Sequence, residues 1–198
     1  MLSQQNDLPG YIYKYDQIAA EKFDSLCKHI LYAGHTFMGV VSQNDMRSVD
    51  YLISMPEVDG SRIGCVGLSM GGLRTTLMMA MDTRVRCGVP VGFPALYPYS
   101  LPQHGMSAWL SAGDLWYKLP FPDFAALAMP RELLVLYCEN DQLFELASMR
   151  RSVETTAAAY EKAGYKNSFM SAGFPVGHQF DYEMQEYAFE WLDAKLKK

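Results

Sequence analysis

The feature that most constrains the fold is an alternation, from about residue 40 onward, of short apolar runs with longer segments of helical periodicity. The strand-like runs are Arg62–Gly67, Val85–Phe93 and Arg131–Cys138, with a shorter one near Ser168–Ser171. The helix-like segments are Val40–Ser54, Leu73–Met81, Leu146–Tyr160 and Tyr182–Lys198. Strands that alternate with helices usually form a parallel sheet covered on both faces. The pattern therefore predicts an α/β fold with a mostly parallel sheet.

Composition narrows the class of partner. The chain has 198 residues, 49% of them apolar, and a net charge of −5, which suits one globular domain. An acidic balance argues against nucleic acid as a partner, because phosphate contacts need a basic face. The apolar runs are also far shorter than the roughly 20 residues that cross a bilayer. We therefore expect neither a nucleic acid nor a membrane partner.

The four cysteines are Cys27, Cys65, Cys87 and Cys138. Their spacing contains no Cys-x-x-Cys pair and no Cys/His ligand pattern, so no metal site is predicted. Three of them lie inside apolar runs, where a reduced cysteine behaves as a small buried apolar residue. This usage is typical of a reducing compartment and favours the cytoplasm, although it leaves the localisation open.

A Gly-x-Ser-x-Gly motif, Gly67-Leu-Ser-Met-Gly71, joins a strand-like run to a helix-like segment. This context is typical of a nucleophile elbow, a sharp turn that exposes the hydroxyl of its serine, here Ser69. We expect glycines at 67 and 71 because side chains there would clash, and Gly72 to let the helix approach the sheet. The structural alternative is a plain glycine turn between a strand and a helix.

A serine nucleophile needs a histidine base, and in this architecture the base follows the serine in the chain. Only His104 and His178 follow Ser69. His178 lies in a loop between the last strand and the last helix, where parallel sheets place their sites. His104 has no strand in front of it. His178 is therefore the predicted base.

The acid that orients the base should follow a strand as well. Glu139, Asp141 and Glu145 all follow the run Arg131–Cys138. Asp141 is the preferred candidate, because three residues beyond the strand let its loop turn toward a neighbouring histidine loop. Glu139 is the alternative. Asp181 is instead a candidate N-cap of the final helix.

The oxyanion of a tetrahedral intermediate needs two hydrogen-bond donors. The backbone N–H of Met70, the residue after the nucleophile, is one candidate. The second donor normally comes from a loop after an earlier strand.

The stretch Pro94–Pro130 interrupts the alternation and is rich in proline and aromatic residues. Long loops with their own aromatic residues often form a lid or a binding wall. Trp109, Trp116 and Tyr117 are therefore candidate substrate-binding residues that could stack on a sugar. The alternative is an insertion that only packs on the core.

Several motifs together resemble one family of enzymes. They are Asp45–Leu52, Pro56–Asp59, Arg62–Gly64, Gly67–Gly72, Pro122–Leu127, Leu133–Leu136 with Asp141, and Gly177-His178. This set, from about Leu31 to the C-terminus, resembles the alpha/beta hydrolases around acetyl xylan esterases, cephalosporin-C deacetylases and dienelactone hydrolase-like proteins. The resemblance implies an esterase with Ser69, Asp141 and His178 as its triad, a short acyl group and no cofactor. Dienelactone hydrolases proper carry a cysteine nucleophile, so Ser69 favours the ester-hydrolase branch.

The sequence departs from this family ahead of the elbow, where members have several strands. Here the segment before residue 62 contains one strand candidate, Tyr11–Tyr15. We therefore expect residues 1–198 to form a single alpha/beta-hydrolase domain that resembles the carboxyl-terminal portion of a larger one. An unpaired strand edge favours association, so a homo-oligomer is possible.

These observations predict hydrolysis of a carboxylic ester, on a small molecule or a carbohydrate, through an acyl-Ser69 intermediate. Two alternatives remain open. One is a serine peptidase of the prolyl-oligopeptidase type, which shares the fold and the order of the triad. The other is a catalytically incomplete fragment or binding module that keeps the triad residues.

Overall fold

The computed structural model describes residues 9–94, 108–110 and 115–197. The chain divides into two compact units, residues 1–40 with 106–112, and residues 41–105 with 113–198. In the first unit, helix α1 (Pro9–Tyr32) carries the buried Cys27. The ring of Phe23 contacts the ring of Phe37 edge-on, with 4.9 Å between the ring centroids. The short 3-10 helix η2 (Ala108–Leu110) also belongs to this unit.

The strand expected at Tyr11–Tyr15 is wrong, because these residues lie inside α1. Tyrosines at every second position imitate the period of a strand, but the flanking residues favour a helix. Pro9 occupies the first turn, where its missing N–H costs no hydrogen bond. The helix then continues through Ala19, Ala20 and Glu21, which are strong helix formers.

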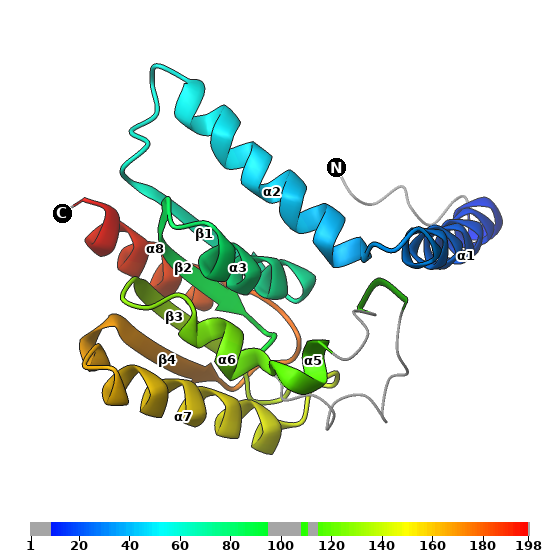
Figure 1. Cartoon of the computed structure of the whole chain (residues 1–198). Coiled ribbons are helices and arrows are strands. Elements are labelled where there is room, and N and C mark those ends of the chain that lie inside the picture. Colours follow the sequence, from blue (N-terminus) through cyan, green and yellow to red (C-terminus); the bar gives the residue numbers. More distant parts are fainter. Residues whose placement is uncertain (1–8, 95–107, 111–114, 198) are drawn as a thin grey trace. The chain divides into compact units, whose positions relative to one another are not determined.

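The second unit contains a four-stranded, fully parallel sheet whose strands are paired in chain order (Figure 1). Its strands are β1 (Ile63–Leu68), β2 (Val85–Val91), β3 (Glu132–Cys138) and β4 (Phe169–Phe174). The four strands match the four apolar runs of the sequence, so the predicted α/β class is confirmed.

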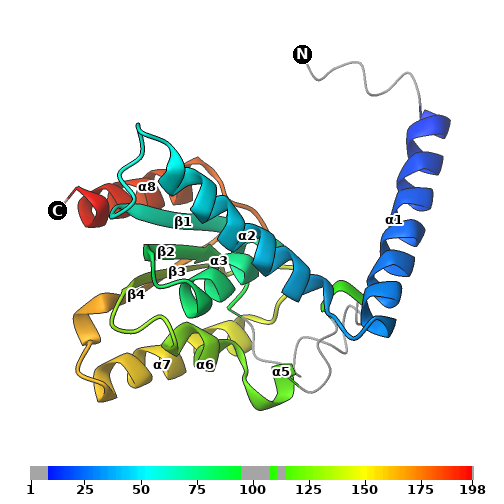
Figure 2. The same cartoon turned by 45° about the horizontal axis from the view of Figure 1, so that its top comes forward.

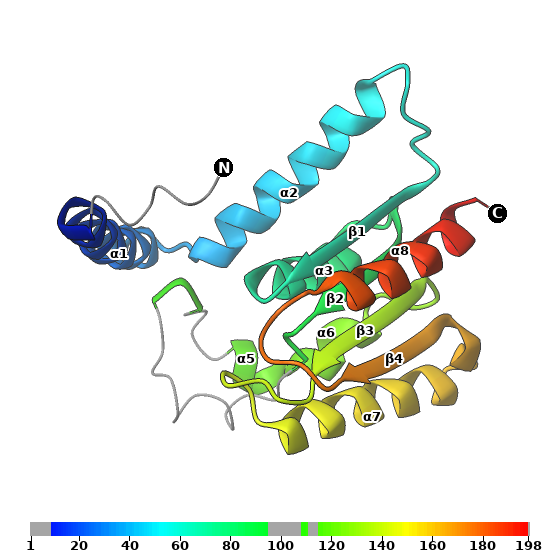
Figure 3. The same cartoon turned by 180° about the vertical axis from the view of Figure 1, so that it is seen from behind.

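Helices cover both faces of this sheet (Figures 1 and 3). On one face pack α2 (Phe37–Ser54), α3 (Met70–Met81), α6 (Phe121–Ala126) and α7 (Leu146–Lys162). On the other face packs α8 (Tyr182–Leu196). Two short helices, α5 (Leu115–Lys118) and η3 (Lys166–Ser168), lie in the connections. None of the described helices is long and apolar enough to cross a membrane.

Strand β3 shows why the sheet is buried on both sides. Leu133 and Val135 point into the core under α3, α6 and α7, whereas Leu134, Leu136 and Cys138 point into the core under α8. All five are fully buried. A strand with a helix layer on each face needs apolar residues at consecutive positions, which explains the unbroken apolar run in the sequence.

Part of the proline-rich stretch Pro94–Pro130 belongs to the core. Phe121 and Ala125 of α6, and Ala128 beyond it, are buried together with residues of α3 and α7. The ring of Trp116 is 8% exposed and lies 5.5 Å, centroid to centroid, from that of Phe124. The end of this stretch therefore packs on the core, as the structural alternative expected. Residues 95–107 and 111–114 lie outside the described residues.

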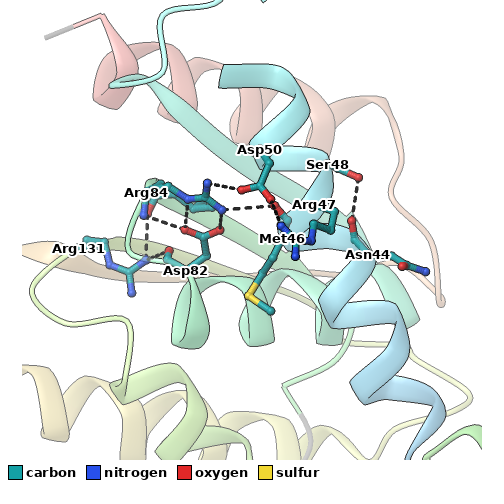
Figure 4. Close-up of polar contacts among 9 residues, drawn as sticks. Asn44, Met46, Arg47, Ser48, Asp50, Asp82, Arg84 and Arg131 are labelled. Atoms are coloured by element: carbon teal, nitrogen blue, oxygen red, sulfur yellow. Dashed lines mark hydrogen bonds and ion pairs between the residues drawn. The ribbon is translucent and has the colours of Figure 1, made fainter. Parts of the chain in front are cut away.

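Two arginines stabilise the junction of α3 with β2, and one of them, Arg84, also connects it to α2 (Figure 4). Arg131 donates to the backbone carbonyls of Met79, Asp82 and Val85, where α3 ends and β2 begins. Arg84 donates to Asp82 and reaches Asp50 of α2, with an Nη1–Oδ1 distance of 2.5 Å. Carbonyls at the end of a helix lack intrahelical donors, and Arg131 supplies donors to two of them, those of Met79 and Asp82.

Both edges of the sheet are open in the part of the chain that the structure describes, because β1 and β4 each pair with one described strand only. Strand β1 pairs with β2 on one side, and no described strand pairs with its other side. A cavity of about 260 Å³ lies between α2, β1 and α3 beside this strand. Figure 2 shows α2 crossing the sheet near the edge that β1 forms. The Arg74 guanidinium, which lines the cavity, is paired with Asp45 at 2.5 Å.

Candidate active site

The candidate site lies where the strands end. Ser69 directly follows β1, Gly92 directly follows β2, and Asp141 and His178 lie in the loops after β3 and β4. Parallel strands bring their carboxyl ends to the same edge of a sheet, which is where α/β proteins place their ligands. The topology therefore gathers residues from four separate parts of the sequence.

Ser69 has the backbone geometry of a nucleophile elbow. Its φ is 58° and its ψ is −119°, and it is the only residue other than glycine with a positive φ in the described part of the chain. Its N–H donates to the carbonyl of Val91 (2.8 Å), and its carbonyl accepts from Leu73 in the first turn of α3 (3.0 Å). These two bonds hold a conformation that costs about 1–3 kcal/mol. Such strain is typical of functional positions.

Two of the three glycines around Ser69 are required by close packing. A Cβ on Gly67 would lie 2.6 Å from the backbone of Gly71, and a Cβ on Gly72 would lie 2.5 Å from the carbonyl oxygen of Val91. A Cβ on Gly71 would meet nothing within 4 Å. The expected clash of a side chain at Gly71 is therefore wrong: the crowded position is Gly67, and Gly71 contributes only its backbone.

Asp141 is buried and uses both carboxylate oxygens. Its Oδ1 accepts from the backbone N–H groups of Leu143 (2.7 Å) and Phe144 (3.3 Å), which closes the turn after β3. Its Oδ2 lies 2.7 Å from Nδ1 of His178. The Asp141 side chain is 0% exposed and that of His178 is 15% exposed. The turn thus fixes one oxygen and leaves the other to hold the imidazole.

Hydrogen bonds between the two loops continue the pairing of β3 with β4 beyond the strands. The N–H of Glu139 donates to the carbonyl of Phe174 (2.7 Å), and the N–H of Asn140 donates to the carbonyl of Val176 (3.0 Å). The side-chain amide of Asn140 also donates to the carbonyl of Pro175 (2.9 Å). These bonds set the register in which Asp141 meets His178.

The end of β2 lies between the elbow and the imidazole. Ser69 is bonded to Val91, and the next residue, Gly92, has a φ of +64°. A Cβ on Gly92 would lie 3.5 Å from Cε1 of His178 and 3.1 Å from Cδ1 of Leu68. The distance to the imidazole is an ordinary van der Waals contact, so the positive φ of Gly92 is what favours glycine here. The imidazole of His178 thus lies next to the residue that follows β2, the neighbour of the strand that carries the elbow.

The structure brings Asp141 and His178 together but leaves the contact between His178 and Ser69 unmade. Nε2 of His178 is buried, and among the described residues it has no hydrogen-bond partner. The hydroxyl of Ser69 likewise forms no hydrogen bond within the described ranges. Such contacts are often long without substrate and shorten in the reacting complex.

The alternative acids occupy other positions. Glu139 pairs with Arg150 at 2.8 Å. Asp181 is the N-cap of α8 and accepts from the N–H of Met184 at 3.0 Å, as the sequence suggested. His104, the alternative base, lies outside the described residues. Among the described carboxylates, only Asp141 is bonded to His178.

The remaining predicted site residues are placed only in part. Met70 is the first residue of α3, where a backbone N–H has no intrahelical acceptor. Trp116 is buried against Phe124, which leaves little of its ring for a substrate. Trp109 lies in η2, in the first of the two units. The side chain of Tyr117 lies outside the described residues.

The thiols of β1 and β2 are unreactive. Burial raises the pKa of Cys65 to about 12 and that of Cys87 to about 11. A thiol is nucleophilic as its thiolate, so neither is a plausible nucleophile at neutral pH. All four cysteines are free, and Cys87 and Cys138 are fully buried as expected, whereas Cys65 is only partly buried. Cys27 of α1 is fully buried as well. The described residues contain no group of three or more His, Cys, Asp or Glu placed to hold a metal ion.

Comparisons with known proteins agree with this architecture. No protein-family model matches the chain. The chain is 24% identical over 156 residues to the Bacillus subtilis (strain 168) protein named "Putative hydrolase YtaP". The match includes 76% of this chain and 52% of that protein, so the chain spans about half the length of the curated relative it matches.

Solved structures of carbohydrate esterases resemble the chain in fold. A family 15 glucuronoyl esterase from Caldicellulosiruptor kristjansonii has a TM-score of 0.66 at 19% identity, over 81% of this chain and 50% of its own. The glucuronoyl esterase catalytic domain from Hypocrea jecorina has a TM-score of 0.63 at 19% identity, over 81% of this chain and 52% of that one. A "putative acetyl xylan esterase" from Bacteroides fragilis has a TM-score of 0.64 at 18% identity, over 77% of this chain and 40% of that one. The chain therefore has the alpha/beta-hydrolase fold over most of its length.

Some site residues were not found by the sequence reasoning. Asn140 and Phe144 flank Asp141 and shape its loop, but neither belongs to a motif with a known role. The signal that could have found Asn140 is its place directly before the acid, because asparagine commonly bonds to backbone in turns. Gly92 carries a comparable signal, as a glycine directly after an apolar strand.

Proposed function

We propose that the protein is a serine hydrolase that cleaves carboxylic esters through an acyl-Ser69 intermediate. The observation that carries the proposal is the strained backbone of Ser69 next to β2, with the buried carboxylate of Asp141 bonded to His178 at the same edge of the sheet. Similarity in fold to carbohydrate esterases supports an ester as the substrate. A short acyl group, such as acetyl, is part of the proposal through the resemblance to acetyl xylan esterases.

In this mechanism Ser69 Oγ attacks the ester carbonyl carbon while Nε2 of His178 accepts its proton. The oxyanion that forms accepts a hydrogen bond from the N–H of Met70. The intermediate then expels the alcohol, which takes the proton back from His178, and the acyl group remains on Ser69. Water repeats the sequence, giving the carboxylic acid and free Ser69. Asp141 holds Nδ1 of His178 throughout and stabilises the imidazolium.

Fluorophosphonate labelling followed by peptide mass spectrometry tests the proposed nucleophile. We expect stoichiometric modification of Ser69 in the wild-type chain and none in Ser69→Ala, because a fluorophosphonate reacts with a serine activated by its base. The purified chain should also hydrolyse p-nitrophenyl acetate faster than Ser69→Ala does. An equal rate in the two proteins, with no label on Ser69, would contradict the proposal.

A substrate panel then distinguishes ester classes. Acetylated xylo-oligosaccharides place the sugar on the alcohol side of the ester, whereas a methyl ester of glucuronic acid places it on the acyl side. A preference for the first would support a short acyl group. A proline-containing peptide amide in the same panel tests the peptidase alternative, and we expect no cleavage of it.

A second candidate function is a binding module that keeps these residues without hydrolysing esters. One observation favours it: neither Nε2 of His178 nor the Ser69 hydroxyl has a partner among the described residues. Such a module would bind the ester without turnover. Isothermal titration with an acetylated oligosaccharide, run on the wild type and on Ser69→Ala, would then show equal affinity and no heat of hydrolysis.

A further inference from the structure

The imidazole of His178 is held by more than its bond to Asp141. One hydrogen bond at Nδ1 fixes a point on the ring but leaves the tilt of the ring about that bond free. The ring of Phe144 supplies a second contact, with a centroid distance of 5.8 Å and an interplanar angle of 52°. The backbone of Gly92 lies close to the ring as well, since a Cβ there would come within 3.7 Å of Nδ1. Contacts of this kind restrict the tilt.

Phe144 is itself fixed by backbone and ring. Its N–H donates to Oδ1 of Asp141 at 3.3 Å, so the carboxylate that holds the imidazole also holds Phe144. Its ring meets that of Phe93 edge-on, with a centroid distance of 5.1 Å and an interplanar angle of 71°. Such pairs are favourable beyond the area they bury. The orientation of Phe144 therefore depends on both the acid loop and Phe93.

Phe93 is anchored in turn to the first turn of α3. It is 4% exposed and directly follows Gly92. A Cβ on Gly72 would lie 3.2 Å from Cβ of Phe93, so Phe93 packs where the helix leaves the elbow. Contacts thus run from Gly72 through Phe93 and Phe144 to the imidazole of His178.

We infer that Phe144 is a positioning residue: its ring, backed by Phe93, holds the imidazole plane of His178 in the orientation that directs Nε2 toward Ser69. This inference rests on the proposed hydrolase function. It assigns Phe144 no contact with the reacting atoms. Small displacements of a catalytic group lower turnover strongly, because attack requires aligned atoms. Loss of the Phe144 ring therefore lowers the turnover number and leaves substrate affinity unchanged.

The experiment compares Phe144→Leu, Phe144→Tyr and the matched control Phe169→Leu. Phe169 also belongs to a ring pair, 5.3 Å from Tyr160, but begins β4 at the opposite end of that strand from His178. On p-nitrophenyl acetate we expect Phe144→Leu to lower kcat about 10- to 100-fold with KM unchanged. Phe144→Tyr restores kcat because its ring fills the same place, and Phe169→Leu leaves kcat at the wild-type value.

Proton and nitrogen NMR of the histidine rings supplies a readout that needs no turnover. The His178 signals are assigned with His178→Asn. In Phe144→Leu we expect the ring protons of His178 to lose the ring-current shift of a neighbouring aromatic ring and to broaden. In Phe144→Tyr we expect the same chemical shifts and line widths as in the wild type. Phe169→Leu leaves these signals where they are in the wild type.

The outcomes separate this inference from the proposed function. If the wild type is no faster than Ser69→Ala, the hydrolase proposal fails, and the NMR spectra alone decide whether Phe144 orients the imidazole. If the wild type is active, equal kcat values and unmoved His178 signals in Phe144→Leu overturn the inference. An equal loss of kcat in Phe169→Leu, or no recovery in Phe144→Tyr, overturns it too, because general loss of packing would then explain the effect.

Discussion

At the scale of single residues, Asp141 combines two tasks that are often divided between groups. Oδ1 closes the turn after β3, and Oδ2 holds the imidazole of His178. The position of the acid is therefore set by its own hydrogen bonds. An amide at this position keeps an acceptor for the turn but no longer carries the negative charge that stabilises an imidazolium.

We predict that Asp141→Asn lowers kcat by about four orders of magnitude, as loss of the acid does in serine triads generally. Ester hydrolysis under saturating substrate measures the effect. Glu139→Gln is the matched control, because Glu139 pairs with Arg150 instead of His178, and it should keep near-normal activity. Reversed results in the two variants would identify Glu139 as the acid.

A second prediction concerns the two glycines of the elbow motif. Gly67→Ala forces a Cβ to within 2.6 Å of the Gly71 backbone, and overpacking of this kind costs about 1–3 kcal/mol. Gly71→Ala places its Cβ in open space at the start of α3, and alanine favours a helix over glycine by up to about 1 kcal/mol. Urea denaturation should therefore show a lower free energy of unfolding for Gly67→Ala and no decrease for Gly71→Ala.

How far the site could be predicted at this scale depends on the kind of contact. Ser69, Asp141 and His178 were identifiable because each lies at a recognisable place relative to a strand. Phe144 was not, because its contacts with Phe93 and His178 join loops far apart in the sequence. Side-chain contacts between distant loops leave no spacing to read, and an aromatic residue in a loop carries no specific signal.

At the scale of elements, the described helices and strands from residue 37 onward were largely predictable. Apolar runs such as that of β3 are long enough, and buried enough on both faces, to leave a clear pattern. The short helices are the exceptions, and α6 is the one that enters the core. Its six residues lie in the proline-rich stretch and show too short a pattern for helical periodicity. Its place in the core depends on α7, which lies later in the chain.

The junction of α3 with β2 carries a dependence on pH. Asp82 is 5% exposed, and hydrogen bonds from Arg84 lower the pKa of its carboxyl, against the opposing effect of burial. Because the pKa is lower in the folded state than in the unfolded one, the carboxylate stabilises the fold above about pH 4. That contribution is lost as the pH falls through the folded-state pKa.

We therefore predict that Asp82→Asn lowers the free energy of unfolding more at about pH 6 than at about pH 3. Denaturant titrations at the two pH values measure the difference. Asp193→Asn is the control, since Asp193 is 64% exposed in an i,i+4 pair with Lys197 and should change stability little at either pH. An equal decrease in the free energy of unfolding of Asp82→Asn at both pH values would show that the charge of Asp82 does not contribute to stability.

At the scale of the whole molecule, the open edge of β1 is the feature with the largest consequence. Its backbone groups on that side have no partner strand among the described residues, and Val66 within it is 36% exposed. Exposed strand edges pair readily with other chains. A second copy of the chain offers the same edge, so we propose association of the protein with itself through β1.

We predict that the sedimentation coefficient rises with protein concentration, and that Val66→Lys reduces the rise, because a lysine on an edge strand disfavours pairing. Met170→Lys is the matched control on the opposite edge strand, where Met170 is 42% exposed. A coefficient that stays constant over the concentration range in the wild type would exclude association through β1.

The carboxyl ends of β1, β3 and β4 supply Ser69, Asp141 and His178, so none of these residues has its neighbours until the strands have paired. Contacts between residues so distant in the sequence form late and slowly in folding. The reactivity of Ser69 therefore reports when the last step of refolding is complete. After dilution from denaturant, the helical circular dichroism signal should return first, and covalent labelling of Ser69 should follow it with a measurable delay.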